Sequence, residues 1–284
     1  MNYLSFVERI TQLNIDAEKI NISHRSRQAP SINPNAKNIL IFSPHPDDES
    51  ITGALALRLY REAGFQIINV PVTLGGDPHE MQRRRQELEA ACTVLQFSIN
   101  DLSDSGLSNI TPTYRMTNPQ EWLSYVTIVQ SVIKKYNPVG IIFPHSEDLH
   151  PSHMGVNLLV FDALSGVVNG NSIVLFEFEY WQAMQSPNLM VESSNHDVSL
   201  LVEAIACHEG EMKRSSYHIK QIAWMIDNVR RGSEMIASLG VQTKNYQFAT
   251  LYRQSFWNNG EQCIGNTKIS IDKEELKIKE LLEL

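Results

Sequence analysis

The sequence has few cysteines, and their spacing excludes two kinds of site. Cys92, Cys207 and Cys263 are widely separated and form no CxxC pair. Neither a disulfide framework nor a thiolate zinc site is therefore expected. Any metal ion would have to be bound by histidine and carboxylate side chains.

The sequence also lacks long apolar runs and large basic clusters. No stretch approaches the roughly 18 consecutive apolar residues that span a bilayer, and the first part of the chain has no signal-peptide core. We therefore expect a soluble, cytoplasmic protein with no membrane insertion. The longest basic run is 83–85 in a chain of net charge −8, whereas nucleic-acid-binding surfaces are usually basic. We expect no nucleic-acid partner.

The common phosphate-binding motifs are absent too. Two glycines in the stretch 72–77 follow a predicted strand, where a glycine-rich loop can approach a phosphate. The chain has neither GxGxxG nor GxxxxGK(S/T), and a glycine pair more often marks a tight turn. A nucleotide-binding site is therefore not favoured.

Apolar segments alternate between strand and helix patterns from residue 38 onward. The chain has 284 residues and 42% hydrophobic content, which is enough for one large core. Short β-branched runs indicate buried strands, and segments with helical spacing lie between them. Strands are predicted at 38–42, 65–74, 139–143, 172–178 and 246–252, and helices at 80–97, 121–137 and over much of 198–231.

This alternation predicts an α/β fold: a Rossmann-like three-layer sandwich with a mainly parallel sheet flanked by helices. We expect three parts: an N-terminal helical extension over 1–36, one main domain over 37–265 and a charged C-terminal tail over 266–284.

Two polar clusters follow predicted strands and contain the candidate catalytic and metal-binding residues. The first is PHPDDES, in which His45 and Asp48 are three residues apart and Asp47 and Glu49 flank Asp48. In open α/β sheets the reactive groups gather outside the carboxyl ends of the strands. Helix capping alone would explain one carboxylate, but adjacent carboxylates repel each other unless a cation neutralises them.

The second cluster, HSEDLHPSH at 145–153, follows a neighbouring predicted strand. One of its histidines, together with His45 and Asp48, would complete a His, carboxylate, His set with an open coordination position. Such a set is typical of catalytic zinc, which acidifies a water molecule. Asp47 lies beside a ligand and is free to act as general base. The other interpretation is a polar surface loop with satisfied histidines.

These motifs resemble the LmbE-like, or PIG-L, family of zinc-dependent N-deacetylases. The family pattern is an apolar strand followed by (P/A)HPDDE and a later HPxH, and the chain has PHPDDES and HPSH. RRQELEAACTVL at 84–95 is similar to the family's R-x-x-E-L helix, and DSGL at 104–107 to its D-S-G-(M/L) loop. The resemblance covers roughly residues 38–160.

The resemblance implies a role for each matching residue. It implies that His45, Asp48 and His153 bind one Zn²⁺ per chain and that Asp47 is the general base. His150 would stabilise the oxyanion and help protonate the leaving amine. Two further matches, Arg84 and Asp104, would contact the sugar substrate. The implied reaction is removal of the N-acetyl group from an N-acetylglucosamine-type moiety of a glycoconjugate or small metabolite.

The chain departs from the family pattern at two places. Ser152 stands where many members have an aspartate that orients an imidazole, so Asp148 is the candidate substitute, and Glu49 is a second candidate for supporting the ligands. Asp148 itself stands where some members have a tyrosine. Roles for three other histidines stay open: His145, His208 and His218.

Two other functions are compatible with the same residues. A His, carboxylate, His set also suits non-haem iron(II) enzymes, although these sites are generally built on antiparallel barrels. A non-catalytic sugar-binding protein would keep the cleft but has no need for a base such as Asp47. Aromatic residues that could line a sugar-stacking wall are Tyr180 and Trp181, with Met184 beside them. The oligomeric state is not indicated.

Overall fold

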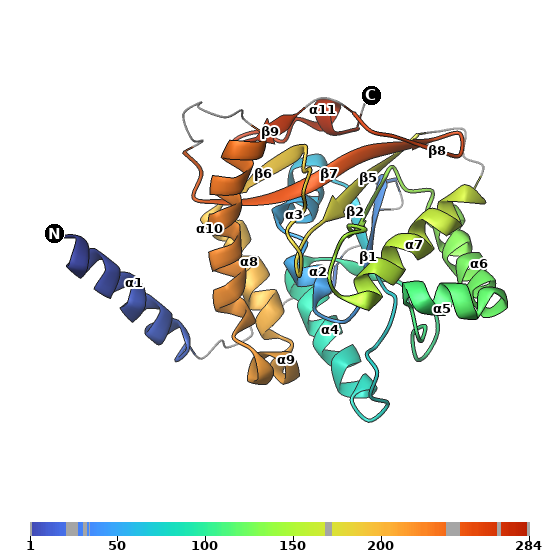
Figure 1. Cartoon of the computed structure of the whole chain (residues 1–284), viewed down its shortest axis with the longest axis horizontal. Helices are drawn as coiled ribbons and strands as arrows, with labels where there is room; N and C mark the ends of the chain where they lie inside the picture. The colour runs from blue at the N-terminus through green and yellow to red at the C-terminus, as the bar shows by residue number, and fades with distance from the viewer. Residues whose placement is uncertain are drawn as a thin grey trace.

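The structure of the protein is a computed structural model that describes residues 2–20, 28–30, 33, 35–167, 172–236, 245–265 and 268–282. Helices cover both faces of a single central sheet, and α1 (Tyr3–Ala17) projects away from this body (Figure 1). The predicted α/β fold with a mostly parallel sheet is confirmed. Within the described part of the chain, no helix combines the length and the apolar character that crossing a bilayer requires.

The strands run in the order β3-β2-β1-β4-β5-β7-β6-β9, and β8 pairs with β7. Their bounds are β1 (Asn38–Ser43), β2 (Gln66–Pro71), β3 (Ser98–Ile99), β4 (Gly140–Pro144), β5 (Ile173–Phe178), β6 (Leu189–Ser193), β7 (Phe248–Asn258), β8 (Glu261–Cys263) and β9 (Ile269–Ile271). β1 pairs in parallel with both β2 and β4. The strand order therefore reverses direction at β1 and β4, which is where open α/β sheets form their ligand crevice.

The helices lie in two layers. Their bounds are α2 (Asp48–Ile51), α3 (Ala54–Ala63), α4 (Met81–Leu95), α5 (Pro112–Thr117), α6 (Pro119–Tyr136), α7 (Pro151–Ser165), α8 (Asn195–Ala206), α9 (Glu209–Arg214), α10 (Tyr217–Met235) and α11 (Ile278–Leu282). One apolar cluster joins the sheet to α3, α4, α8 and α10, and a second joins it to α6 and α7. Figure 1 shows α6 and α7 on the opposite side of the sheet from α8 and α10.

The apolar run of β1 explains why it lies at the centre of the sheet. Ile39 and Ile41 pack into one cluster, while Leu40 and Phe42 pack into the other, because successive strand residues point to opposite faces. All four side chains have no exposed surface. The sequence of a strand that is buried on both faces is continuously apolar, whereas a strand with one exposed face alternates apolar and polar residues.

Two regions differ from the pattern predicted from the sequence. The helical stretch over 198–231 is broken into α8, α9 and α10, with non-helical residues at 207–208 and 215–216. Near the C-terminus, β9 pairs in parallel with β6 and so adds a strand to the sheet. The division at residues 36 and 265 stays a prediction.

Candidate functional site

The loop after β1 positions the first cluster through a tight turn. The backbone N–H of His45 donates to Asp48 Oδ2 at 2.8 Å, and the same oxygen lies 3.2 Å from His45 Nδ1. Between them Asp47 has a backbone φ of 129°, a conformation that residues with a side chain rarely adopt. Its N–H donates to Glu49 Oε2 at 3.0 Å. The turn thus brings His45 and Asp48 together and holds Asp47 between them.

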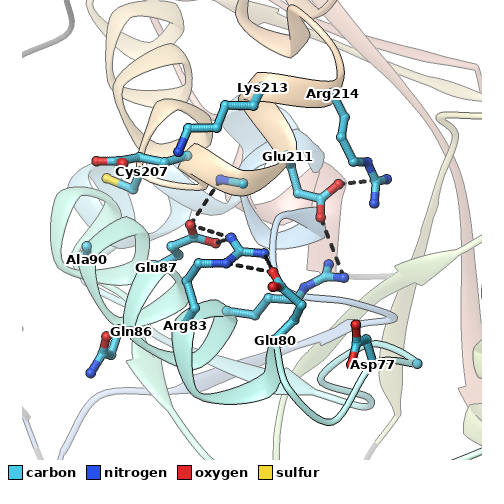
Figure 2. Close-up of a pocket in the computed structure, with 14 residues that line it drawn as sticks. Asp77, Glu80, Arg83, Gln86, Glu87, Ala90, Cys207, Glu211, Lys213 and Arg214 are labelled. Carbon is cyan, nitrogen blue, oxygen red and sulfur yellow. Dashed lines mark hydrogen bonds and ion pairs between the residues drawn. The ribbon is translucent and has the colours of Figure 1, made fainter.

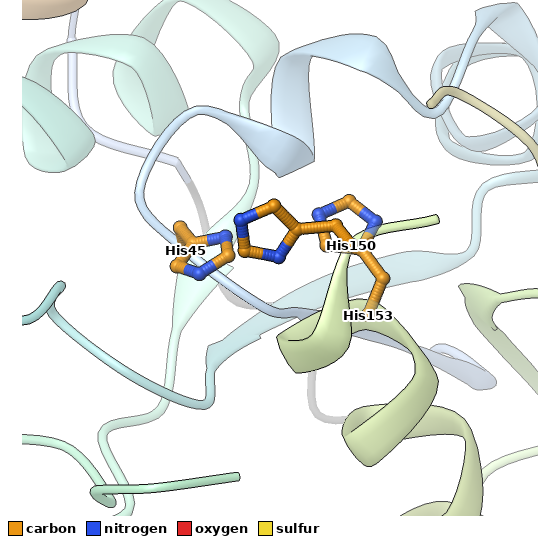
Figure 3. A group of neighbouring side chains, drawn as sticks. All are labelled: His45, His150 and His153. Atoms are coloured by element: carbon orange, nitrogen blue, oxygen red, sulfur yellow. The ribbon is translucent and has the colours of Figure 1, made fainter. Parts of the chain in front are cut away.

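The loop after β4 delivers the second cluster to the same place. β4 lies beside β1 in parallel, so the two loops leave the same edge of the sheet. His150 caps the N-terminus of α7, where its Nδ1 accepts from the Ser152 N–H at 3.3 Å. His153 follows in the first turn, and its Nε2 lies 3.3 Å from Asp48 Oδ1. The three histidine rings, His45 included, converge in space (Figure 3).

The donor atoms fit a divalent cation. His153 is fully buried, and neither of its ring nitrogens makes a hydrogen bond of good geometry within the described residues. Its Nε2 lies beside the Asp48 carboxylate, at a distance that leaves both groups able to bind the same metal ion. Ligand atoms of His45, His150 and His153 all lie within 4.8 Å of one another, and Asp48 contacts two of these histidines. Imidazole nitrogens with one carboxylate suit Zn²⁺ or iron(II).

The carboxylate of Asp48 and the imidazole of His153 each stabilise the charged form of the other. Burial would raise the pKa of Asp48, but His153 and His45 outweigh it and lower the pKa far below its usual value. Burial would lower the pKa of His153, whereas Asp48 and then Asp148 raise it to about 10. Asp148 Oδ2 lies 3.4 Å from His153 Nδ1 and also accepts from the Trp181 N–H. Asp148 thus lies beside this imidazole, and its role in orienting the ring stays a prediction.

Asp47 is placed differently from Asp48. Burial first, and then the neighbouring Asp48, raise the pKa of Asp47 well above its usual value, while Arg84 opposes this effect. Arg84 Nη2 lies 4.0 Å from Asp47 Oδ2 and donates to the Pro46 carbonyl at 3.0 Å. A Cβ at Gly75 would lie 2.7 Å from the Arg84 guanidinium, so the glycine permits this close approach. Asp47 is thus a partly shielded carboxylate whose affinity for a proton is increased.

A cavity of about 350 Å³ opens above the cluster, and we call it the central cavity. It is lined by His45, Asp47, Asp48, Ile51, Gly75, Gly76, Arg84, His150, Ser152, Tyr180, Trp181, Ile205, Glu211, Arg214 and Tyr217. Tyr180 and Trp181 thus line it as expected, but Met184 is buried elsewhere. Asp104 is exposed and does not line the central cavity, so its role as a substrate contact stays a prediction.

The remaining histidines lie outside the central cavity. The Nε2 of His208, which is fully buried, lies 2.8 Å from Glu49 Oε1 behind the cluster. Glu49 therefore links His208 to the backbone of Asp47. His145 and His218 contact backbone carbonyl oxygens, those of Gln182 and Ala17.

Several lining residues were not found from the sequence. Glu211, Arg214 and Tyr217 reach the central cavity from α9 and the start of α10. No motif marks them, because their position depends on how the helices pack. The only signal was the charged, helical character of their segment.

Fold and site together define a class: α/β proteins with a histidine and carboxylate cluster at the switch point of a mostly parallel sheet. Residues 40–164 match the family model described as "PIG-L: GlcNAc-PI de-N-acetylase". This part of the chain is therefore similar to the PIG-L family. The family resemblance of the sequence motifs is thereby confirmed.

One curated relative and two solved structures illustrate the likeness. The chain is 31% identical over 141 residues to the probable N-acetyl-alpha-D-glucosaminyl L-malate deacetylase 2 of Bacillus subtilis (strain 168), covering 45% of this chain and 61% of that protein. The match thus spans about three fifths of the length of this curated relative.

The structures are more distant in sequence. N,N'-diacetylchitobiose deacetylase from Pyrococcus horikoshii is 16% identical, with a TM-score of 0.57 and coverage of 88% of this chain and 92% of that chain. GalB, the 4-carboxy-2-hydroxymuconate hydratase from Pseudomonas putida KT2440, is 19% identical, with a TM-score of 0.56 and coverage of 77% and 95%. At these identities the likeness concerns the fold alone.

Proposed function

We propose that this protein is a metal-dependent N-deacetylase that removes the N-acetyl group from an N-acetylglucosamine-type sugar. The observation that carries the proposal is the convergence of His45, Asp48 and His153 beside the carboxylate of Asp47. Within the described residues, Asp47 forms no hydrogen bond or ion pair with these three side chains. The family match and the deacetylase activity for which the Bacillus subtilis relative is named support the same reaction class.

The proposed metal ligands are His45, Asp48 and His153, with Asp148 orienting His153. A bound Zn²⁺ would supply a Lewis acid that makes water acidic and polarises the amide carbonyl. Zinc is proposed because imidazole and carboxylate ligands with an open position are typical of its catalytic sites.

Asp47 would carry the proton through the reaction. Its carboxylate accepts a proton from water as the water oxygen attacks the acetyl carbon, and then transfers this proton to the nitrogen when the C–N bond breaks. The products are acetate and the free amine. A pKa raised by burial suits this role, because the base must hold the proton between the two steps.

His150 would stabilise the oxyanion of the tetrahedral intermediate. Its Nδ1 accepts a backbone hydrogen bond, so in the neutral ring Nε2 carries the proton and can donate. Burial first, and then His45, lower the pKa of His150 and favour this neutral form. Arg84, within the central cavity, would donate to hydroxyl groups of the sugar.

The test combines metal analysis with product analysis. Purified protein loaded with Zn²⁺ is incubated with N-acetylglucosamine and its glycosides, and released acetate and free amine are measured in parallel. Equal amounts of both products are expected. Sugar binding without release of either product would instead identify a binding protein. Activity with iron(II) but not with Zn²⁺ would show that iron is the metal.

A further inference from the structure

The helix α1 carries apolar side chains that nothing covers within the described part of the chain. None of its residues is buried, and Figure 1 shows it projecting away from the central sheet. It contacts the body at its end, where His218 Nε2 of α10 lies 3.1 Å from the Ala17 carbonyl oxygen. Its large exposed apolar side chains are Tyr3, Leu4, Phe6, Val7, Ile10, Leu13 and Ile15. A helix of 15 residues is only marginally stable alone in water, so we expect it to pack against a partner.

Most of these apolar residues form a seam of the kind found in coiled coils. They recur at alternating spacings of three and four, which places them on one side of the helix. The seam residues are Tyr3, Phe6, Ile10, Leu13 and Ala17, and Ile20 continues the series just beyond the helix. Ile15 lies on the side of the helix away from the seam, at the outermost position of the heptad. The spacing therefore favours another helix as the partner.

The charges of this segment argue against a lipid surface. Residues 2–20 contain two basic side chains, Arg9 and Lys19, and three acidic ones, Glu8, Asp16 and Glu18. Helices that lie on membranes usually carry several lysine and arginine side chains that attract anionic lipids. An acidic excess would repel such a surface, so a protein partner fits the segment better.

A second copy of α1 matches the seam when the two helices run antiparallel about a two-fold axis between residues 11 and 12. Ile10 of each copy then packs against Leu13 of the other. Phe6 packs against Ala17, so a large side chain faces a small one and the distance between the helices stays even. Tyr3 and Ile20 form the outermost layers. The sequence of α1 is thus complementary to itself.

The same register brings Arg9 of one copy beside Asp16 of the other, at two symmetric places. These residues flank the seam on one side, where antiparallel coiled coils form ion pairs. Arg9 has no ion pair or hydrogen bond within the described residues. Arg83 on α4, by contrast, is paired within the chain with Glu80 and Glu87 (Figure 2). Arg9 is therefore available to a second copy.

Other arrangements of the two helices are less favourable. A shift of one heptad in the antiparallel pair would place Arg9 beside Arg9 of the second copy, and like charges repel. In a parallel pair Phe6 would face Phe6 and Ala17 would face Ala17, so the seam would be crowded at one end and hollow at the other. Charge and side-chain size therefore select the same antiparallel register.

We propose that α1 is a dimerisation helix, which pairs antiparallel with α1 of a second copy of this chain. The interface is isologous, since the same face is used by both copies. A helix of 15 residues is about 22 Å long, so the buried area lies at the low end of specific interfaces, below about 1,200 Å². The dimer is accordingly reversible, with a Kd on the order of 10 µM.

Sedimentation velocity of the full chain over about 1–100 µM tests this inference, because that range spans the expected Kd. The wild type should change from one copy to two as its concentration rises. Ile10→Asp places a carboxylate in both central layers and should weaken the dimer at least about 100-fold. The matched control is Ile15→Asp, because Ile15 is exposed to a similar extent, 42% against 46%, and lies away from the seam. It should change the Kd by less than about twofold.

Charge reversal tests the register. Arg9→Asp and Asp16→Arg each place like charges together and should weaken the dimer about tenfold, whereas the two changes in one chain should restore it. The two residues are about 10 Å apart along their own helix, so restoration must act between copies.

The inference is overturned by a wild type that stays a single copy at about 100 µM, well above the expected Kd. Equal loss of the dimer in Ile10→Asp and Ile15→Asp, or in neither, overturns it too. A doubly reversed variant that does not dimerise contradicts the antiparallel register. A wild type that stays a single copy but binds phosphatidylserine vesicles through Ile10 would assign the seam to a membrane instead.

Discussion

Asp47 has the least favourable backbone conformation in the region of the site, with φ at 129° in a residue that carries a side chain. Such strain costs on the order of 1–3 kcal/mol and persists only where neighbouring contacts hold it. Here the neighbours are Glu49, which accepts the Asp47 N–H, and His208, which contacts Glu49. We expect this conformation to keep the Asp47 carboxylate away from the proposed metal ligands and available for a proton.

Asp47→Asn should separate catalysis from metal binding. The amide cannot accept a proton, so acetate release should fall by about 10²–10⁴-fold, the usual contribution of a general base. Zinc content, measured by elemental analysis, should stay at the wild-type level. Unchanged turnover in this variant would remove Asp47 from the mechanism.

His153→Ala should abolish metal binding. It deletes a fully buried imidazole that lies between Asp48 and Asp148, and it leaves two buried carboxylates facing each other. Zinc content should fall below about a tenth of the wild-type value, because removing a ligand costs more than the 10- to 100-fold seen for supporting residues.

The matched comparison for His153 is His150→Ala, which should keep the metal but lose about 10²–10³-fold in turnover, as when an oxyanion donor is removed. Loss of zinc from His150→Ala would instead indicate that His45, His150 and His153 together form the ligand set.

At the scale of elements, α4 and α9 meet at the central cavity through Arg84 and Glu211. We expect Glu211 to hold the guanidinium of Arg84 in position, since Asp47 is a competing carboxylate 4.0 Å away. Glu211→Gln should therefore lower kcat/KM about tenfold in the wild-type background but less than about twofold in an Arg84→Gln background. A double-mutant cycle measures this coupling, and additive effects would show that Glu211 acts independently of Arg84.

On β5, Glu177 offers a test of pH-dependent stability away from the metal cluster. Burial raises the pKa of Glu177 to about 6, although Arg253 and Asn157 oppose this effect. Because the folded-state pKa lies above the unfolded value, Glu177 disfavours the folded state once it ionises. This penalty is absent below about pH 4.5 and complete above about pH 6.

Glu177→Gln should therefore stabilise the protein at pH 7.5 by about 2 kcal/mol and have little effect at pH 4.5. Denaturant unfolding at both pH values measures the difference. A gain of equal size at the two pH values would show that the effect does not come from ionisation. The variant keeps an oxygen that can accept from Asn157 Nδ2, which lies 3.2 Å from Glu177 in the wild type.

The elements also show which parts of the site can be predicted from sequence. His45 and His153 meet because each follows a buried strand, and adjacent parallel strands end at one edge. Such strands are visible as apolar runs. Glu211 and Tyr217 reach the cavity only because α8, α9 and α10 break and turn between residues 206 and 217, and that depends on packing with α4. Asp104 matches a family motif but does not line the central cavity, so a motif match alone does not predict which residues line it.

For the whole molecule, metal removal should lower both activity and stability. A cation that binds only the folded protein stabilises it by about 2.7 kcal/mol when present at 100 times its Kd. Treatment with a chelator should therefore lower the Tm by several degrees and abolish acetate release, and added Zn²⁺ should restore both. Equal Tm values with and without the metal would contradict a site shared by two loops of the folded chain.

The pairing of β1 with β4 has a consequence for the order of events during synthesis. Two of the residues proposed to bind the cation, His45 in the loop after β1 and His153 at the start of α7, are more than a hundred positions apart. They meet only after β1 and β4 have paired. Loop closure over such a distance must precede any gain from coordination. The nascent chain would therefore acquire its ion only after α7 has left the ribosome and docked, so loading with metal reports that β1 and β4 have paired.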